Sequence, residues 1–186
     1  MVQERRILGR KELRNGFFAV LDSNFDYSIE KPDGTLLLEE KFNFVYDFYD
    51  GICIVKKHDK KEYYLREDGT FISDKGYHHV IPFASGMGTV NKENLSWDWI
   101  MPNGELFFKK WVKEAYPDFL SPILHVVFED DTKAMYDERD NSVKYYNDEE
   151  EWVRKGTSVI CAEVEGNNMK RSPKIGLLFN LLMSVI

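Results

Sequence analysis

Short apolar runs recur along the chain at a fixed spacing, and polar or glycine-containing segments separate them. The clearest runs are Phe17-Phe18-Ala19-Val20, Ile52-Cys53-Ile54-Val55, Met87-Gly88-Thr89-Val90 and Thr157-Ser158-Val159-Ile160, with Val126 at the corresponding place in the remaining copy. Runs this short that contain β-branched and aromatic residues are typical of strands on a half-buried sheet surface. The pattern therefore predicts many short strands.

Glycines mark the same period as the apolar runs. Gly16, Gly51, Gly86 and Gly156 lie on one 35-residue grid, and Ser121 fills the remaining position. A second set, Gly34, Gly69 and Gly104, ends turns of the Asp-Gly or Asn-Gly kind. Such turns favour β-hairpins because both central residues tolerate positive φ. A fixed period in this range is the signature of a repeat protein.

The segments that flank these turns complete one repeat. Strands are predicted before them at 63–65, 97–100 and 134–136, and after them at 35–38, 70–72, 105–108 and 143–146, around a weaker turn at Asp140-Asn141 in the last case. Each copy then forms a three-stranded antiparallel meander that is too small to bury its face alone, so stacked neighbours complete its core.

We therefore predict an all-β fold in which tandem repeats stack into a solenoid-like or rolled sheet. A single array is predicted over residues 1–168, with copies near 7–41, 42–76, 77–112 and 113–147 and a partial copy at 148–168.

The repeat resembles that of the WG-repeat (KWG-repeat) proteins of bacteria. The resemblance is carried by Tyr64-Leu65-Arg66-Glu67-Asp68-Gly69-Thr70-Phe71-Ile72, then Tyr77, then Phe83-Ala84-Ser85-Gly86 with Val90. It also includes Trp99-Ile100-Met101-Pro102-Asn103-Gly104, and Phe42 with Phe48-Tyr49-Asp50-Gly51. The Trp-Gly dipeptide itself is absent from the sequence. The resemblance implies a β-repeat scaffold with a binding role and no defined chemistry.

Composition narrows the classes of partner. The 186 residues carry a net charge of −7 and are 31% charged, and basic clusters are short and lie beside acids. Nucleic-acid binders need clustered Lys and Arg, so no nucleic-acid partner is expected. Cys53 and Cys161 do not suggest a disulfide scaffold, and residues 1–6 lack the apolar run of a signal peptide. We expect a cytoplasmic protein.

The last residues depart from the repeat. Residues 175–186 form the most apolar stretch of the chain and follow a basic segment at 170–174. A membrane-spanning helix needs about 20 apolar residues, so no membrane span is expected. Residues 169–186 are predicted to cap the open end of the array; the alternative is a docking segment, which would allow a homodimer.

The sequence contains no recognisable catalytic, cofactor or metal constellation. Its four histidines have no zinc-site spacing, and the pair His78-His79 on one strand would point to opposite faces. Acidic runs such as 129–131 and 148–151 are interpreted as solvated turns, and neither a P-loop nor a nucleophile elbow is present. We therefore expect a non-enzyme without a cofactor.

Aromatic residues outside the repeat pattern are the best binding candidates, because the scaffold does not account for them. They are Trp97, Trp111, Tyr145, Tyr146 and Trp152. The favoured hypothesis is a binding module for a protein or peptide. One alternative is a carbohydrate-binding or glycan-processing module that uses open, coplanar aromatic rings. The other is an acidic, immunity-type inhibitor of a basic protein, which would need its acids gathered on one face.

Overall fold

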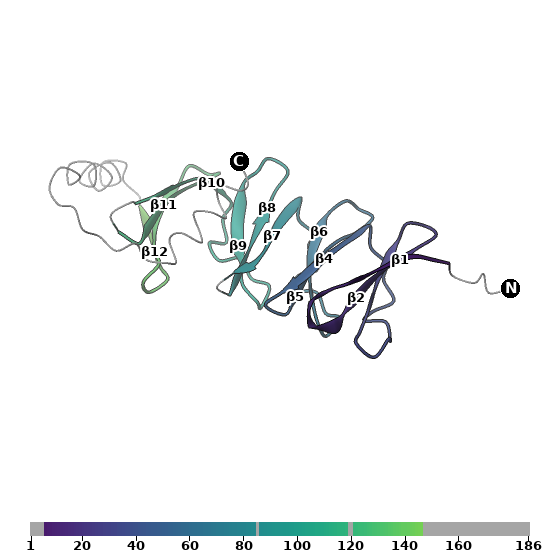
Figure 1. The fold of residues 1–186 in the computed structure, drawn as a ribbon. Coiled ribbons are helices and arrows are strands. Elements are labelled where there is room, and N and C mark those ends of the chain that lie inside the picture. The colour runs from purple at the N-terminus through teal and green to yellow at the C-terminus, as the bar shows by residue number, and fades with distance from the viewer. Residues whose placement is uncertain (1–5, 85, 119–120, 147–186) are drawn as a thin grey trace, which may run out of the picture. The chain divides into compact units, whose positions relative to one another are not determined.

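The computed structural model describes residues 6–84, 86–118 and 121–146. Strands dominate these residues, as predicted, and the fold is all-β (Figure 1). The elements are β1 (Ile7–Glu12), η1 (Arg14–Gly16), β2 (Phe18–Asp22), β3 (Tyr27–Glu30), β4 (Phe44–Tyr49), β5 (Ile52–Lys56), β6 (Glu62–Arg66), β7 (His79–Ala84), β8 (Met87–Asn91), β9 (Trp97–Ile100), β10 (Val112–Pro117), β11 (Ile123–Phe128), β12 (Lys133–Asp137) and β13 (Ser142–Tyr146).

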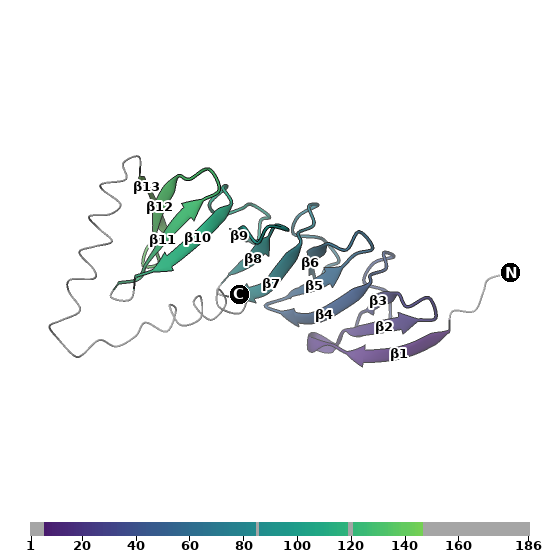
Figure 2. The same cartoon turned by 90° about the horizontal axis from the view of Figure 1, so that it is seen from above.

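The chain forms two compact units, Met1–Lys109 and Lys110–Ile186. In the first unit, β1–β3, β4–β6 and β7–β9 each pair in sequence order and follow one another along the unit (Figure 2). In the second unit, β10 to β13 also pair in sequence order. All these pairs are antiparallel, which confirms the all-β repeat of antiparallel strands, although β1, β4, β7 and β10 are not among the strands predicted from the sequence.

Strand register follows the period read from the sequence. Val20 lies opposite Ser28, Val55 opposite Tyr63, and Val90 opposite Asp98. The partners are 35 residues apart from one copy to the next, as the valines are. The repeat is therefore a repeat of backbone pairing as well as of composition.

The periodic glycines have two structural reasons. Gly69 and Gly104 have φ of 86° and 87°, a left-handed conformation that glycine adopts without steric penalty. A Cβ on Gly69 would also lie 3.0 Å from the carbonyl oxygen of Leu37, and one on Gly104 would overlap the carbonyl oxygen of Ile72. Both oxygens belong to the preceding copy. These turns therefore bring successive copies into close backbone contact.

One part of the predicted repeat is wrong. Residues 35–38, 70–72 and 105–108 are predicted to form strands, but each contributes a single bridge, at Leu36, Phe71 and Leu106. In the first two copies, the first residue of β3 or β6 is bonded to the next copy, through Tyr27–Phe42 and Glu62–Tyr77. The outer edge of β3 or β6 is then divided between the next copy and the segment after the turn. That segment therefore cannot pair along the whole strand. β13 instead pairs along the whole of β12.

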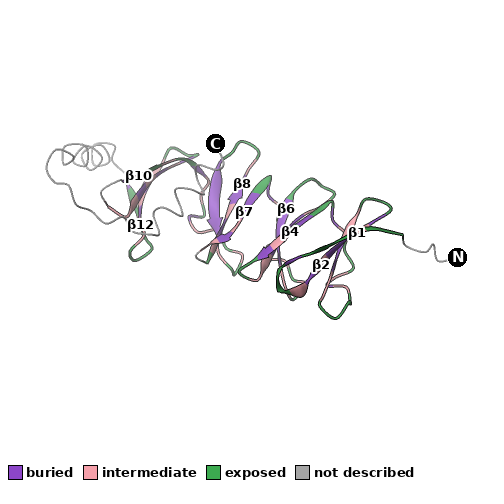
Figure 3. Ribbon diagram, in the orientation of Figure 1, coloured by how far each residue is buried: buried purple, intermediate pink, exposed green. Residues whose placement is uncertain are grey.

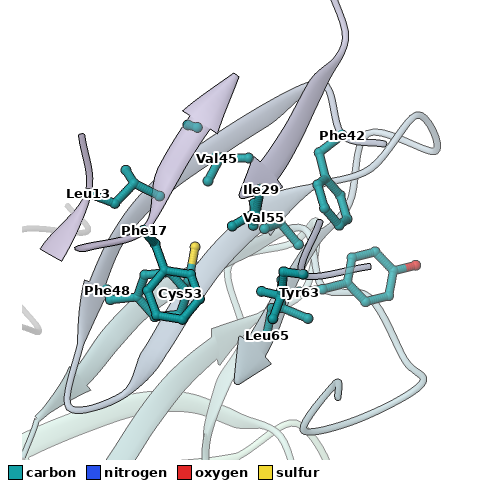
Figure 4. Close-up of a cluster of buried hydrophobic side chains, with 12 residues drawn as sticks. Leu13, Phe17, Ile29, Phe42, Val45, Phe48, Cys53, Val55, Tyr63 and Leu65 are labelled. Carbon is teal, nitrogen blue, oxygen red and sulfur yellow. The ribbon is translucent and has the colours of Figure 1, made fainter. Parts of the chain in front are cut away.

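The core of the first unit lies between its copies. Leu13, Phe17 and Ile29 from the first copy pack with Phe42, Phe48 and Val55 from the second (Figure 4). The rings of Phe17 and Phe48 lie 4.7 Å apart. Burying such a side chain contributes roughly 1.5–3 kcal/mol, so neighbouring copies stabilise each other. Cys53 is buried in this cluster as a free thiol, and burial raises its pKa.

Candidate functional site

Two of the aromatic residues predicted to form a binding surface are buried. Trp97 is 7% exposed and packs against Trp99 and Phe108, at ring-centroid distances of 5.4 and 6.2 Å. Tyr146 is 6% exposed. The expectation that these rings are open to a ligand is therefore wrong. Trp97 is enclosed by the rings of Trp99 and Phe108, which its place in the sequence alone does not reveal.

The remaining predicted residues have different surroundings. Trp111 is half-buried, and Tyr145 is exposed on β13 with its ring stacked on Phe128 at 5.8 Å. Trp152 lies outside the described residues, as do Cys161, the partial fifth copy at 148–168 and the segment 169–186. Binding by Trp111, Tyr145 and Trp152 stays a prediction.

The structure gathers another set of aromatic rings at the junction of the first two copies. Tyr27 begins β3, and Phe44 and Tyr46 lie on β4; these three residues are called the aromatic surface. The ring centroids of Tyr27 and Phe44 are 5.8 Å apart, and those of Phe44 and Tyr46 are 4.8 Å apart. Phe44 is 43% exposed and Tyr46 is 39% exposed. The Phe44 ring therefore contacts both other rings, and Phe44 and Tyr46 face solvent while Tyr27 is half-buried.

Backbone pairing explains why these rings meet. Tyr27 and Phe42 exchange two backbone hydrogen bonds of 2.8 and 2.9 Å, which hold the start of β3 beside the residues that lead into β4. Alternate residues of a strand point to the same face, so Phe44 and Tyr46 share one side of β4 while Val45 is buried on the other. The surface follows from the contact between copies.

A buried carboxylate lies next to this surface. Glu62, the first residue of β6, is buried; its Oε2 accepts a hydrogen bond of 2.9 Å from the Val80 backbone amide and lies 2.9 Å from Nδ1 of His79. The hydroxyl of Tyr46 lies 3.5 Å from Oε1 of Glu62. Burial, and then the Glu62 carboxylate, raise the pKa of Tyr46. The Glu62–His79 pair thus connects the second copy to the third.

The pairing fixes how the His79 ring is presented. A histidine that donates from Nδ1 to a carboxylate keeps Nε2 available as an acceptor, or as a donor when the ring is protonated. About half of the His79 side chain is exposed. His79 occupies the repeat position of Phe44, 35 residues earlier. The same repeat position therefore carries an exposed apolar ring, Phe44, in the second copy and an exposed polar ring, His79, in the third.

Sequence reasoning misses this pair. His79 is considered there only as a possible metal ligand beside His78, and Glu62 is not among the candidates. The available signal is that Glu62 stands in a strand position that holds Tyr27 and Trp97 in the adjacent copies. A charged residue in such a position requires a partner when it is buried, which directs attention to the next copy.

Asp98 is the other buried acid of note. It is fully buried on β9, and desolvation raises its pKa to about 7. Its Oδ1 accepts hydrogen bonds from the backbone amides of Trp99 and Phe108 at 2.7 and 3.1 Å, while Oδ2 has no hydrogen-bond partner among the described residues. The carboxyl group cannot reach solvent, so its effect is on stability.

Two further features of the described residues concern metals and membranes. No group of three or more His, Cys, Asp or Glu in this part of the chain is placed to hold a metal ion. The same part contains no helix that is long and apolar enough to cross a membrane.

Comparisons with known proteins give structural similarity without a family. No family model matches the chain, and no curated protein matches it. Among solved structures, it is similar to the computationally designed Ika4 protein, with 13% identity and a TM-score of 0.36 over 77% of this chain and 92% of that chain. It is similar to the WD40 β-propeller domain of Doa1, with 13% identity and a TM-score of 0.32 over 71% of this chain and 50% of that chain. It is also similar to BamB from Moraxella catarrhalis, with 8% identity and a TM-score of 0.37 over 74% of this chain and 48% of that chain. The chain thus spans about half the length of the last two.

Proposed function

We propose that the protein is a non-enzymatic β-repeat scaffold that binds a protein or peptide through the aromatic surface and His79. The observation that carries the proposal is the exposure of Phe44 and Tyr46, whose rings contact each other and, through Phe44, the half-buried ring of Tyr27 at a junction that already has its own core. Aromatic side chains that leave solvent are the usual anchors of protein interfaces.

Ring geometry favours a peptide over a sugar. The planes of Tyr27 and Phe44 are inclined at 63°, and those of Phe44 and Tyr46 at 65°. A carbohydrate platform would need coplanar rings, whereas inclined rings form the walls of a site for irregular side chains. His79 supplies a polar contact beside them, because its Nε2 can accept a hydrogen bond from a peptide N–H.

Membership of the WG-repeat family stays a prediction of the repeat pattern. A cytoplasmic location likewise remains a proposal. Both are compatible with a scaffold whose copies differ mainly in the side chains that they present on one surface, as Phe44 and His79 do in the second and third copies.

Peptide selection provides the test. The full chain is used to select binders from a phage-displayed library of random linear peptides, and the selected peptides are then titrated against the double variant Phe44→Ser, Tyr46→Ser. We expect at least about a tenfold loss of affinity, because two ring contacts together contribute about 1.4 kcal/mol or more. Tyr116→Ser is the matched control, since Tyr116 is an exposed tyrosine at the repeat position of Tyr46.

Either of two results would overturn the proposal. One is a selection that yields no peptide above background. The other is a set of peptides that bind the double variant as tightly as the original chain. A glycan array probed in parallel would move the assignment to carbohydrate if a glycan bound and lost affinity on the same substitutions.

A further inference from the structure

At its N-terminal end, the first copy has a residue equivalent to those through which the second and third copies pair with the copy before them. Ile7 holds the repeat position of Phe42 and Tyr77. Phe42 is fully buried and Tyr77 is buried, because the third strand of the preceding copy lies against each of them. Ile7 is 56% exposed. Within the described residues, nothing covers Ile7 as β3 covers Phe42.

The two complete junctions show what fits at this position. Tyr27 and Phe42 exchange backbone hydrogen bonds of 2.8 and 2.9 Å, and Glu62 and Tyr77 exchange bonds of 2.9 and 3.0 Å. In each case an antiparallel strand presents its first residue to the Ile7 position. An extended backbone is therefore the ligand that this position accepts in the rest of the unit.

Charge adds a second requirement. Lys41, next to Phe42, lies 2.5 Å from Oδ2 of Asp22, which is buried at the end of β2 in the preceding copy. Arg6 stands next to Ile7 at the repeat position of Lys41, and it is exposed. The occupant should then carry an acid where β2 carries Asp22, at the end of the first strand of a hairpin.

Apolar surface around Ile7 is also uncovered. Leu8 and Phe25 are exposed, and most of β1 is exposed along its length (Figure 3). The backbone amide of Ser23 bonds to the Arg6 carbonyl oxygen, and the amide of Phe25 bonds to Asp22, so these residues lie close together. Phe25 is 73% exposed at the hairpin tip, where its φ of 63° is the turn conformation that Lys60 and Leu95 share in the next copies.

We propose that Arg6, Ile7, Leu8 and Phe25 form a strand-addition site for an acidic β-hairpin of another polypeptide chain. The hairpin pairs its second strand with the backbone of Ile7 and places a carboxylate on Arg6, as β2 and β3 do for Lys41 and Phe42. This site shares no residue with the aromatic surface, and it does not depend on the function proposed above.

The hairpin of the first copy supplies a probe. A fluorescein-labelled synthetic peptide of residues 18–30, which spans β2, its turn and β3, is titrated with the full chain by fluorescence anisotropy. We expect saturable binding that falls at least about tenfold in Ile7→Asp and in Arg6→Asp, as one lost ion pair or apolar contact of about 1.4 kcal/mol would give. A peptide with Asp22→Lys should bind the original chain weakly and recover on Arg6→Asp.

A matched control distinguishes binding at this site from non-specific hydrophobic binding of the peptide. Leu95 is an exposed leucine at the hairpin-tip position that Phe25 holds in the first copy, so Leu95→Asp should leave peptide binding unchanged. Thermal melting of all variants establishes that they fold. Absence of saturable binding, or equal binding by Ile7→Asp, would overturn the proposal. So would sedimentation with phosphatidylserine vesicles that Ile7→Asp abolishes while the peptide fails to bind, since the site would then take a lipid surface.

Discussion

Carboxylates at several turns of this protein accept hydrogen bonds from residues of the same turn. Asp33 and Asp68 each accept hydrogen bonds from the amide and the hydroxyl of the threonine two residues later. These hydrogen bonds lower the pKa of both acids. Asp130 makes the same contacts with Thr132 at a hairpin tip. Acids used in this way stabilise turns, so their negative charge has a structural role in the repeat.

Asp98 makes folding depend on pH. Its folded pKa is raised to about 7 from 3.8 because burial disfavours the charged form. The Asp98 carboxyl therefore ionises at lower pH in the unfolded chain than in the folded chain. Its contribution to the free energy of unfolding is fully present below about pH 4 and is lost as the pH rises through about 7. We expect Asp98→Asn to remove this loss. Each tenfold difference in proton affinity between the folded and unfolded chains corresponds to about 1.4 kcal/mol.

Urea denaturation between about pH 4 and pH 8 measures this effect. The free energy of unfolding of the original chain should fall over this range more steeply than that of Asp98→Asn. Asp74→Asn, at an exposed position, is the control and should follow the original chain. Parallel curves for the original chain and Asp98→Asn would contradict the assignment.

Turns are the elements that set the spacing of the copies. Gly34 and Gly104 both have strongly positive φ, yet a Cβ on Gly34 meets nothing within 4 Å, while one on Gly104 overlaps the Ile72 carbonyl oxygen. We expect Gly34→Ala to cost about 1–2 kcal/mol from backbone conformation alone. Gly104→Ala should cost more, because the backbone of the preceding copy must also move.

Urea titration of the two glycine variants separates these contributions. The difference between their free energies of unfolding measures the contact between copies, since the conformational cost is shared. Equal losses in Gly34→Ala and Gly104→Ala would mean that the turn of the third copy does not press on the second.

At the scale of the first unit, copies stabilise one another through shared apolar residues. Phe48 is almost fully buried against Phe17 of the preceding copy. Truncation of a buried phenylalanine typically costs about 3–5 kcal/mol, so Phe48→Ala should strongly destabilise this unit. Because copies that share an interface lose stability together, amide hydrogen exchange should accelerate in β1–β3 as well as in β4–β6.

Tyr46→Ala is the control for this change. It removes an exposed ring from the same strand, so exchange in β1–β3 should stay close to that of the original chain. Faster exchange confined to β4–β6 in Phe48→Ala would show that the copies unfold independently.

The sequence by itself determined the repeat, because the features involved are local. Positive φ at Gly69 and Gly104 favours glycine, and the short runs that end at Val55 and Val90 suit a strand whatever lies beyond them. The antiparallel pairing of β5 with β6 and of β8 with β9 could be predicted on these grounds. The structure of the segment after each turn could not be predicted. In the first copy, the edge of β3 pairs with this segment at Leu36 and with the next copy at Phe42.

The tertiary structure alone decided which residues form a surface. Ile7 and Phe42 hold the same repeat position, and one is exposed while the other is buried. Trp97 and Tyr27 are also equivalent, yet Trp97 is enclosed by rings and Tyr27 borders the aromatic surface. Exposure depends on which side chains the adjacent copies supply, and the partner of Glu62 lies 17 residues away across a turn. The repeat period and the hairpin pairing are determined within one copy. The burial of a residue is determined by the side chains that the adjacent copies place over it.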